Sequence, residues 1–219
     1  MDRAGKSVGA IVLAAGRSAR MGRPKQLLPF SGNILAWQVV NEALKAGLSR
    51  VVLVLGYKAD EIRAALKSRM RSHPRLETVV NEDFDRGMST SIIAGLSAIE
   101  TTHDYMMILL ADMPFIRREV IDLLLARYLV SDKPIGAIKL KKGFGHPVVF
   151  HRRVFPELRR LQGDRGARSI IEKYGPKVCL VEPPKAYDPF DIDTRGDFAK
   201  AEKMTDPLNR TSDDHRIRK

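Results

Sequence analysis

The sequence predicts an α/β domain in which a mostly parallel sheet carries helices on both faces. Short apolar runs typical of buried strands alternate along the chain with segments of helical periodicity. The 219 residues, of which 44% are hydrophobic, suffice for one such domain with a full core. Glycines, hydroxyl groups and charges gather largely after predicted strands, at the sheet edge where α/β proteins bind ligands.

Apolar runs bounded by polar or turn-forming residues are the expected strands. They are Val8–Ala15, Arg50–Leu55, Thr78–Val80, Tyr105–Leu110, Ile135–Ile138, Pro147–Phe150 and 177–181. Helical periodicity falls at about 33–46, 58–69, 89–100, 117–130, 152–161, 166–174 and 195–204. We therefore expect one domain over residues 1–204. The polar residues 205–219, with charges of both signs, predict a disordered tail.

Composition limits the class of protein. No apolar run approaches the roughly 20 residues that a helix needs to cross a bilayer, so we expect no membrane partner. The charged segment Met1–Lys6 leads directly into the first strand, so we expect no signal peptide. Cys179 is the only cysteine, which excludes a disulfide within the chain and predicts a cytoplasmic protein.

The net charge of +12 raises the question of a nucleic-acid partner. Residues 133–177 alone contain twelve Lys or Arg and three Asp or Glu. The basic residues are scattered, however, and few aromatic side chains stand among them. A basic rim around a site for small anions and an ordinary solvated surface explain the charge as well, and nucleic acid is not the partner we favour.

The strand Val8–Ala15 runs into Gly16 and a loop that contains three arginines and Lys25. Glycine lets the backbone approach a ligand, backbone amides point at an anion, and basic side chains neutralise it. The loop lacks the Gly-Lys-Ser/Thr of a P-loop, and Ser18 replaces the second glycine of a dinucleotide fingerprint. It therefore predicts a nucleotide polyphosphate site of a third kind.

Two acidic segments are candidates for a Mg²⁺ site. The fourth strand leads to Asp112, whose carboxylate would lie at the rim of the site and bind a metal that holds triphosphate oxygens. The alternative role is an N-cap of the next helix, although Pro114 complicates it. Four carboxylates lie within residues 188–197, and in an extended chain those of Asp191 and Asp193 point the same way.

The segment after the third strand opens a helix through a Gly-x-Ser-x-Ser turn. Ser89 or Thr90 can cap that helix. Capping explains one hydroxyl group but leaves the preceding Gly87 without a role. The turn is therefore a second candidate contact for a ligand.

The first loop reads Leu-x-x-Gly-x-x-x-Arg-Met-x-x-x-Lys from Leu13 to Lys25 and resembles the signature of nucleotidyltransferases with a MobA-like fold. It is most similar to that of the molybdenum cofactor cytidylyltransferases. The resemblance implies a single-domain, Rossmann-like nucleotidyltransferase fold. It implies that Lys25 contacts the phosphates and that Arg20 stabilises the leaving pyrophosphate. Arg20, Lys25 and Asp112 are the implied catalytic residues. Arg17 and Arg23 are expected to be solvated surface charges.

The same resemblance assigns residues to the nucleotide, the metal and the second substrate. Nucleotide contacts are implied for Leu13, Ala14, Ala15, Gly16, Asn81, Gly87, Ser89 and Ser91. Asp112 in Leu-Ala-Asp-Met-Pro and Asp193 in Asp-Ile-Asp-Thr are the implied Mg²⁺ ligands, whereas Asp197 is expected to be a helix-start charge. Gly-His-Pro and Gly-Asp-x-Gly-Ala-Arg resemble pterin-side motifs. They assign the second substrate to His146, Asp164 and Arg168.

The implied reaction is attack by a phosphate oxygen of molybdopterin, or of molybdenum cofactor, on the α-phosphorus of CTP, with loss of pyrophosphate. A phosphomonoester has a second pKa near ~6, so no general base is required. Ala15 in place of a glycine favours CTP over GTP on steric grounds. Two alternatives change the substrates, with GTP as the nucleotide or a sugar phosphate as the acceptor. Two others change the class of protein, to a nucleotide-binding chaperone without catalytic activity or to a nucleic-acid-binding module. A molybdoenzyme or its maturation chaperone is the expected protein partner.

Overall fold

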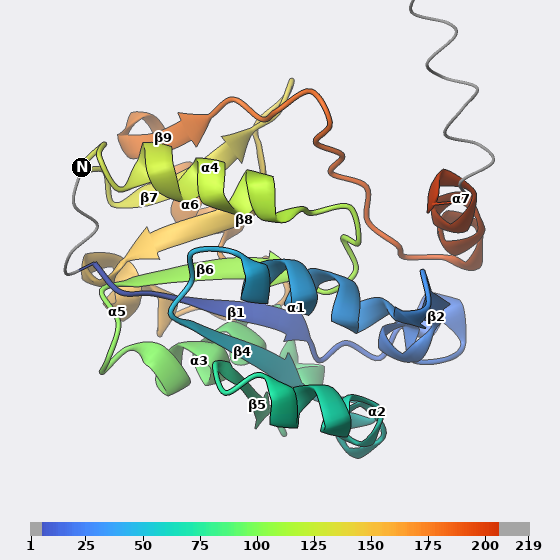
Figure 1. Ribbon diagram of the computed structural model, residues 1–219. Coiled ribbons are helices and arrows are strands. Elements are labelled where there is room, and N and C mark those ends of the chain that lie inside the picture. The colour runs from blue at the N-terminus through green and yellow to red at the C-terminus, as the bar shows by residue number, and fades with distance from the viewer. Residues whose placement is uncertain (1–5, 206–219) are drawn as a thin grey trace, which may run out of the picture.

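The computed structural model describes residues 6–205, which form a seven-stranded sheet covered by helices on both faces (Figure 1). The strand order is β5-β4-β1-β6-β8-β7-β9. The strands are β1 Val8–Ala14, β4 Arg50–Leu55, β5 Leu76–Val80, β6 Tyr105–Leu110, β7 Ile135–Lys139, β8 Phe144–His151 and β9 Val178–Val181. Only β8, among the strands of this sheet in residues 6–205, runs antiparallel to its neighbours. The predicted mostly parallel α/β sheet is therefore confirmed.

Two apolar layers hold the helices to the sheet. The helices are α1 Leu35–Lys45, α2 Ala59–Ser72, α3 Met88–Ile99, α4 Arg118–Tyr128, α5 Phe155–Leu158, α6 Arg168–Tyr174 and α7 Arg195–Thr205. Successive residues of a strand face opposite sides. Val12 of β1 therefore packs in the layer that contains α1, α2 and α4, whereas Ile11 packs in the layer of α3, α5 and α6.

Three segments differ from the sequence prediction. The helix expected at 152–161 is a 3-10 turn, Arg152–Val154, followed by the single turn of α5. The strand expected from Pro147 begins at Phe144, because β7 pairs with the glycine-containing segment across a register shift. The helix expected from residue 33 begins at Leu35, after a small hairpin of β2 (Pro29–Phe30) and β3 (Asn33–Ile34).

A third, smaller apolar cluster ties the C-terminal part of the described chain to the sheet. It contains Phe30 of the hairpin, Phe115 and Ile192, with Ala201 of α7. The Ile192 amide also donates a hydrogen bond of 2.9 Å to the carbonyl of Asp112. The segment before α7 therefore crosses the carboxyl end of β6. The tail expected over 205–219 lies outside the described residues, apart from Thr205, which ends α7.

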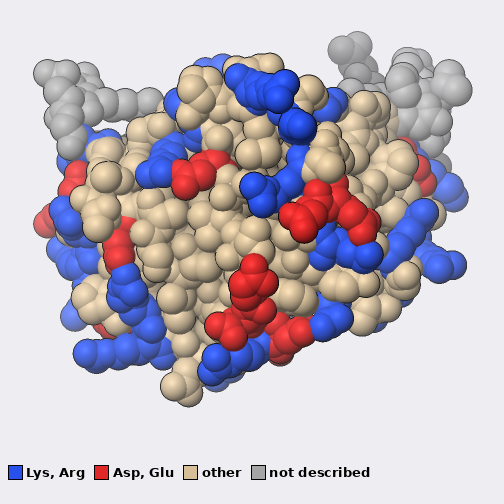
Figure 2. Space-filling model, turned by 90° about the horizontal axis from the view of Figure 1, so that it is seen from below, with Lys and Arg blue, Asp and Glu red and all other residues tan. Residues whose placement is uncertain are grey.

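Two observations bear on the molecular surface. None of the helices within residues 6–205 has the length and apolar character to span a membrane. On the face shown in Figure 2, acidic side chains lie among the basic ones and uncharged residues separate them. That face has the appearance of an ordinary solvated surface rather than a continuous basic one.

Candidate active site

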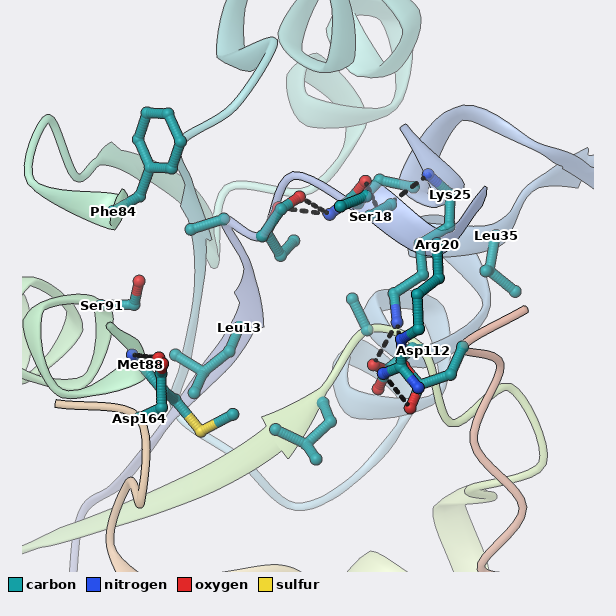
Figure 3. A pocket seen from close by; sticks show the side chains of 18 residues that line it. Leu13, Ser18, Arg20, Lys25, Leu35, Phe84, Met88, Ser91, Asp112 and Asp164 are labelled. Atoms are coloured by element: carbon teal, nitrogen blue, oxygen red, sulfur yellow. Dashed lines mark hydrogen bonds and ion pairs between the residues drawn. The ribbon is translucent and has the colours of Figure 1, made fainter. Parts of the chain in front are cut away.

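A cleft of about 330 Å³ opens at the carboxyl ends of β1 and β6. Its two sides differ in chemistry (Figure 3). Arg20, Lys25, Asp112 and Asp193 form what we call the charged end. Across the cleft, the apolar end is formed mainly by Leu13, Ala15, Phe84 and Met88, with Ser91 and Asp164 beside them. A ligand that spans the cleft therefore meets charge at one end and apolar surface at the other.

Lys25 is the centre of the charged end. Its ammonium group donates to Asp112 Oδ2 at 2.8 Å, to the Ile192 carbonyl at 2.8 Å and to Asp193 Oδ1 at 3.0 Å. The Lys25 side chain is only 14% exposed. Arg20, which is 68% exposed, donates to Asp193 Oδ2 at 2.8 Å. The fold thus unites three segments that lie far apart in the sequence.

The charges of this cluster shift one another's pKa. Burial disfavours the Lys25 ammonium, but Asp112 and then Asp193 outweigh burial and raise the pKa of Lys25. Burial alone would raise the pKa of Asp193, yet its hydrogen bond to Lys25, with the charges of Lys25 and Arg20, lowers it. Burial raises the pKa of Asp191, reinforced by the charges of Asp193 and Asp112. At neutral pH, Lys25 is therefore charged and Asp193 ionised.

The charged end fits a divalent metal that is completed by a substrate. Asp112 Oδ1 is buried and has no hydrogen-bond partner, so it is an acceptor available to a cation. Within residues 6–205, there is no cluster of three or more His, Cys, Asp or Glu side chains that could hold a metal ion by itself. Mg²⁺ characteristically binds through one or two carboxylates together with substrate phosphates. Asp112 and Asp193, which share the Lys25 ammonium, are the two candidate carboxylates at this end of the cleft. Asp112 is not the cap of the next helix, since Arg117 takes that place before α4.

The loop between β1 and Lys25 is held by a side chain that the sequence prediction missed. Gln26 is 3% exposed, and its amide donates to the carbonyls of Ala14 and Gly16, both at 3.0 Å. Ser18, in the left-handed conformation with φ 55°, accepts a hydrogen bond from the Lys25 amide at 3.2 Å. Gln26 directly follows Lys25, the lysine of the motif, and this position is the feature of the sequence that could have identified it.

Arg17 is not the freely solvated charge that the sequence predicts. Its guanidinium lies 5.3 Å from the ring centroid of Tyr57 and 5.2 Å from that of Phe84. It also makes a two-pronged ion pair with Asp85, in which Nε and Asp85 Oδ1 are 2.6 Å apart. Arg23 is exposed, as expected. The two arginines of one loop therefore have different roles.

The segment expected to contact the base lies partly in the cleft wall. Ser91 lines the cleft, and its hydroxyl accepts a hydrogen bond from Asn81 at 2.9 Å. Asn81, Gly87 and Ser89 lie behind this wall and do not line the cleft. Neither Ser89 nor Thr90 caps α3 with its side chain, because Gly87 is the N-cap. These buried residues shape the start of α3 rather than its cleft surface.

Asp164 has a structural contact in addition to its place in the cleft wall. Its carboxylate accepts a hydrogen bond of 3.2 Å from the Met88 amide, and the Gly163 carbonyl accepts one of 3.1 Å from the Ser89 amide. The loop before α6 thus supplies acceptors for the first amides of α3, which have none within the helix. A side chain at Gly87 would meet the Gly163 backbone at 2.6 Å, so only glycine fits there.

A second, mostly apolar pocket of about 150 Å³ adjoins the cleft through Leu13, Met88 and Leu110. His146 and Arg168, two of the three residues expected to contact a second substrate, line this pocket, whereas the third, Asp164, lines the larger cleft instead. Burial lowers the pKa of the His146 imidazole, so it is neutral at pH 7. Arg168 is 69% exposed, pairs with Glu172 and lies 5.8 Å from the Phe144 ring. The pocket therefore combines an apolar floor with a cation at its edge.

The start of α7 explains the carboxylates of the 188–197 segment. Asp197 accepts hydrogen bonds from the Thr194 amide at 2.8 Å and from its hydroxyl at 2.7 Å, while the Asp197 amide donates to the Thr194 hydroxyl. This reciprocal arrangement is a capping box. Asp197 is therefore a helix-start residue, as predicted, and the cap orders the backbone that presents Asp193.

Comparisons with known proteins agree with this geometry. The profile of the MobA-like NTP transferase domain matches residues 10–178. Nicotine blue oxidoreductase of Paenarthrobacter nicotinovorans is 31% identical over 85% of this chain and 92% of its own. Molybdenum cofactor cytidylyltransferase of Escherichia coli K12 is 29% identical over 90% of this chain and 96% of its own.

A solved structure supports the same assignment. Rv0371c of Mycobacterium tuberculosis H37Rv, in complex with manganese, superposes with a TM-score of 0.76 at 27% identity and covers 90% of this chain and 99% of its own. The matched profile covers the first loop and Asp112 of the cleft and His146 of the adjoining pocket, whereas Asp193 lies beyond its end. The chain belongs to the MobA-like NTP transferase family and is a nucleotidyltransferase.

Proposed function

We propose that the protein transfers CMP from CTP to the phosphate of molybdopterin or molybdenum cofactor and releases pyrophosphate. The observation that carries this proposal is the meeting of Lys25, Asp112 and Asp193 at one end of a cleft whose other end is apolar. A nucleoside triphosphate has the matching division between charged phosphates and a flat base. The likeness to a molybdenum cofactor cytidylyltransferase supports the choice of acceptor.

In this proposal, the charged end stabilises the developing charge of the transfer. Arg20 and Lys25 bind the oxygens of the leaving pyrophosphate, and charge stabilisation of this kind is worth about 10²–10³ in rate per contact. The acceptor phosphate is largely ionised at neutral pH, so the residues need only position it in line with the α-phosphorus. Gln26 keeps the phosphate loop in shape through the Ala14 and Gly16 carbonyls.

We propose Mg²⁺ as the metal, held by Asp112 and Asp193. When bound, a divalent cation neutralises phosphate charge and orients the reacting oxygens. Lys25 already bridges the two carboxylates, so the protein keeps them close together. The buried Asp112 Oδ1, which has no hydrogen-bond partner, is the atom that most favours a metal here.

The adjoining pocket is the proposed place of the acceptor. Its apolar floor suits a flat ring, and Arg168 at its edge suits an anionic group. His146 is neutral there and contributes hydrogen bonding and shape rather than charge. We further propose a cytoplasmic location and delivery of the product to a molybdoenzyme or its maturation chaperone.

The test is pyrophosphate release by purified protein with Mg²⁺, molybdenum cofactor and either CTP or GTP. We expect release that needs both the cofactor and CTP, and loss of release in Asp112→Ala. Arg23→Ala is the matched control, because Arg23 is exposed and does not line the cleft. Release with GTP alone would reassign the nucleotide, and an Ala15→Gly variant with unchanged CTP/GTP preference would refute the steric argument.

The same assay separates this proposal from its alternatives. Release only with a sugar 1-phosphate would replace the acceptor and leave the transfer chemistry in place. Folded protein that releases no pyrophosphate with either nucleotide or any acceptor would refute transferase activity. It would then direct attention to the oxidoreductase activity that the name of the Paenarthrobacter relative states.

A further inference from the structure

The apolar end of the cleft includes an aromatic side chain, Phe84. Phe84 lies on a 3-10 turn, Phe84–Arg86, between β5 and α3, and is only partly buried. Met88, at the start of α3, is 41% exposed, which is unusual for a large apolar side chain. Both side chains line the cleft opposite Lys25 and Asp112 (Figure 3). An apolar surface left open inside a cleft marks a place for an apolar part of a ligand.

The backbone beneath Phe84 is built to let the ring lie close. A Cβ at Gly56 would be 2.7 Å from Cβ of Phe84 and 2.9 Å from Cβ of Ala15. Neither atom is the end of a flexible side chain, so only glycine fits between them. The amide of the next residue, Tyr57, donates to the Ala15 carbonyl at 3.0 Å. Phe84 is therefore pressed against the first loop at the residue that follows β1.

Arg17 contacts the same ring through its guanidinium. Its guanidinium lies within 5.3 Å of the centroids of both Tyr57 and Phe84, and the two rings are 6.3 Å apart. Asp85, the neighbour of Phe84, takes both prongs of the guanidinium. Arg17 does not line the cleft, and its charge is already paired. Its contacts suit the positioning of an aromatic ring better than the binding of phosphate.

We infer that the base of the bound nucleotide stacks on Phe84, and that Arg17, with Tyr57 and Asp85, positions this ring. The inference rests on the nucleotide binding of the proposed function and adds a specificity residue to it. The triphosphate belongs at the charged end, so the base reaches the apolar end, where Phe84 offers an aromatic face. Stacking accepts every base, so this contact selects nucleotides over bare polyphosphate rather than CTP over GTP.

The experiment compares the Kd of Mg²⁺-CTP with that of Mg²⁺-tripolyphosphate by isothermal titration calorimetry on the full chain. Base stacking on an aromatic side chain predicts that Phe84→Ala weakens CTP binding about 5- to 150-fold. Tripolyphosphate binding stays within about twofold, since it needs only the charged end, and this retained binding also reports that the variant is folded. Phe84→Tyr, which keeps the ring, restores CTP binding to near the wild-type value.

Arg17→Ala tests positioning against phosphate binding. A positioning residue loses CTP affinity and keeps tripolyphosphate affinity, whereas a phosphate-binding residue loses both. The effect of Arg17→Ala on CTP also disappears in the Phe84→Ala background, because it acts through that ring. Arg23→Ala, on the same loop with the same charge removed, leaves both affinities unchanged.

The outcomes separate this inference from the proposed function. Unchanged CTP binding in Phe84→Ala, or equal losses for CTP and tripolyphosphate, would overturn it. Wild-type protein that binds tripolyphosphate as tightly as CTP would also overturn it. Base-dependent binding through Phe84 in a protein that transfers CMP to no acceptor would support the inference while refuting the proposed function alone.

Discussion

Replacing Lys25 with methionine removes the cation that joins Asp112 and Asp193. Loss of one partner from a fully buried ion pair costs about 3–5 kcal/mol. Here the side chains of Lys25, Asp112 and Asp193 are 14%, 23% and 34% exposed, so solvent screens part of the resulting repulsion. We therefore expect a loss of about 2 kcal/mol in the free energy of unfolding, which for a chain of this size lowers Tm by about 4–8 °C.

The pH dependence of this loss has a definite sign. The pKa of Lys25 is raised in the folded protein. The contribution of its charge to the free energy of unfolding is therefore complete below the pKa of an unfolded lysine, and it is lost as the pH rises through the pKa of the folded state. The pKa of Asp193 is lowered in the folded protein. The contribution of its charge to the free energy of unfolding is therefore complete above the pKa of an unfolded aspartate, and it is lost as the pH falls through the pKa of the folded state. The stability difference from wild type is therefore flat between about pH 5 and pH 9 and narrows below about pH 4.

The assay is urea unfolding of wild type, Lys25→Met and the control Arg20→Ala across this pH range. Arg20 touches the same Asp193 but is 68% exposed, so its loss should change stability by less than about 1 kcal/mol. A divalent cation should stabilise Lys25→Met more than wild type, since it replaces the missing charge between the carboxylates. Equal effects of the two substitutions, or no extra stabilisation by Mn²⁺ in Lys25→Met, would refute the reasoning.

Three further predictions follow from single contacts. Asp112→Asn should lower the rate of pyrophosphate release by about 10²–10³. Thermal melting of Asp112→Asn should show an intact fold. A rate of pyrophosphate release near that of wild type would contradict the catalytic role of Asp112. Gly95→Ala should destabilise the protein by about 1–3 kcal/mol in urea unfolding, because a Cβ there lies 2.8 Å from Cγ2 of Ile11 and 2.9 Å from Cγ2 of Val54. Thr194→Ala should cost about 1 kcal/mol through loss of the capping box, and an unchanged urea midpoint would contradict that cap.

Local patterns were enough to locate most elements of the fold. The parallel strands and the long helices produce strong periodicity over their own residues, so their positions follow from the sequence. The expected helix at 152–161 failed because the chain after Leu158 turns away to supply Gly163 and Asp164 to the start of α3. That contact lies about 75 residues away in the sequence, so periodicity carries no sign of it.

The direction and length of β8 were equally out of reach. Phe144 and Gly145 pair with β7 although glycine and Pro147 normally mark the end of a strand. A side chain at position 145 is disfavoured because the hydroxyl of Tyr187, from a distant segment, would lie 2.8 Å from its Cβ. A residue that looks like a loop signal in the sequence is thus a packing requirement in the fold.

For the site, the sequence by itself determined the chemistry: a basic glycine loop after the first strand, aspartates after the fourth strand and near the C-terminus, and hydroxyls before a helix. Those are properties of single segments. Tertiary structure alone decided the partners. It placed Lys25 against Asp112 and Asp193, 87 and 168 residues away, and it put Arg17 beside two aromatic rings. Ion pairs and ring contacts depend on distances in space, which only the packing of the sheet, the loops and α7 establishes.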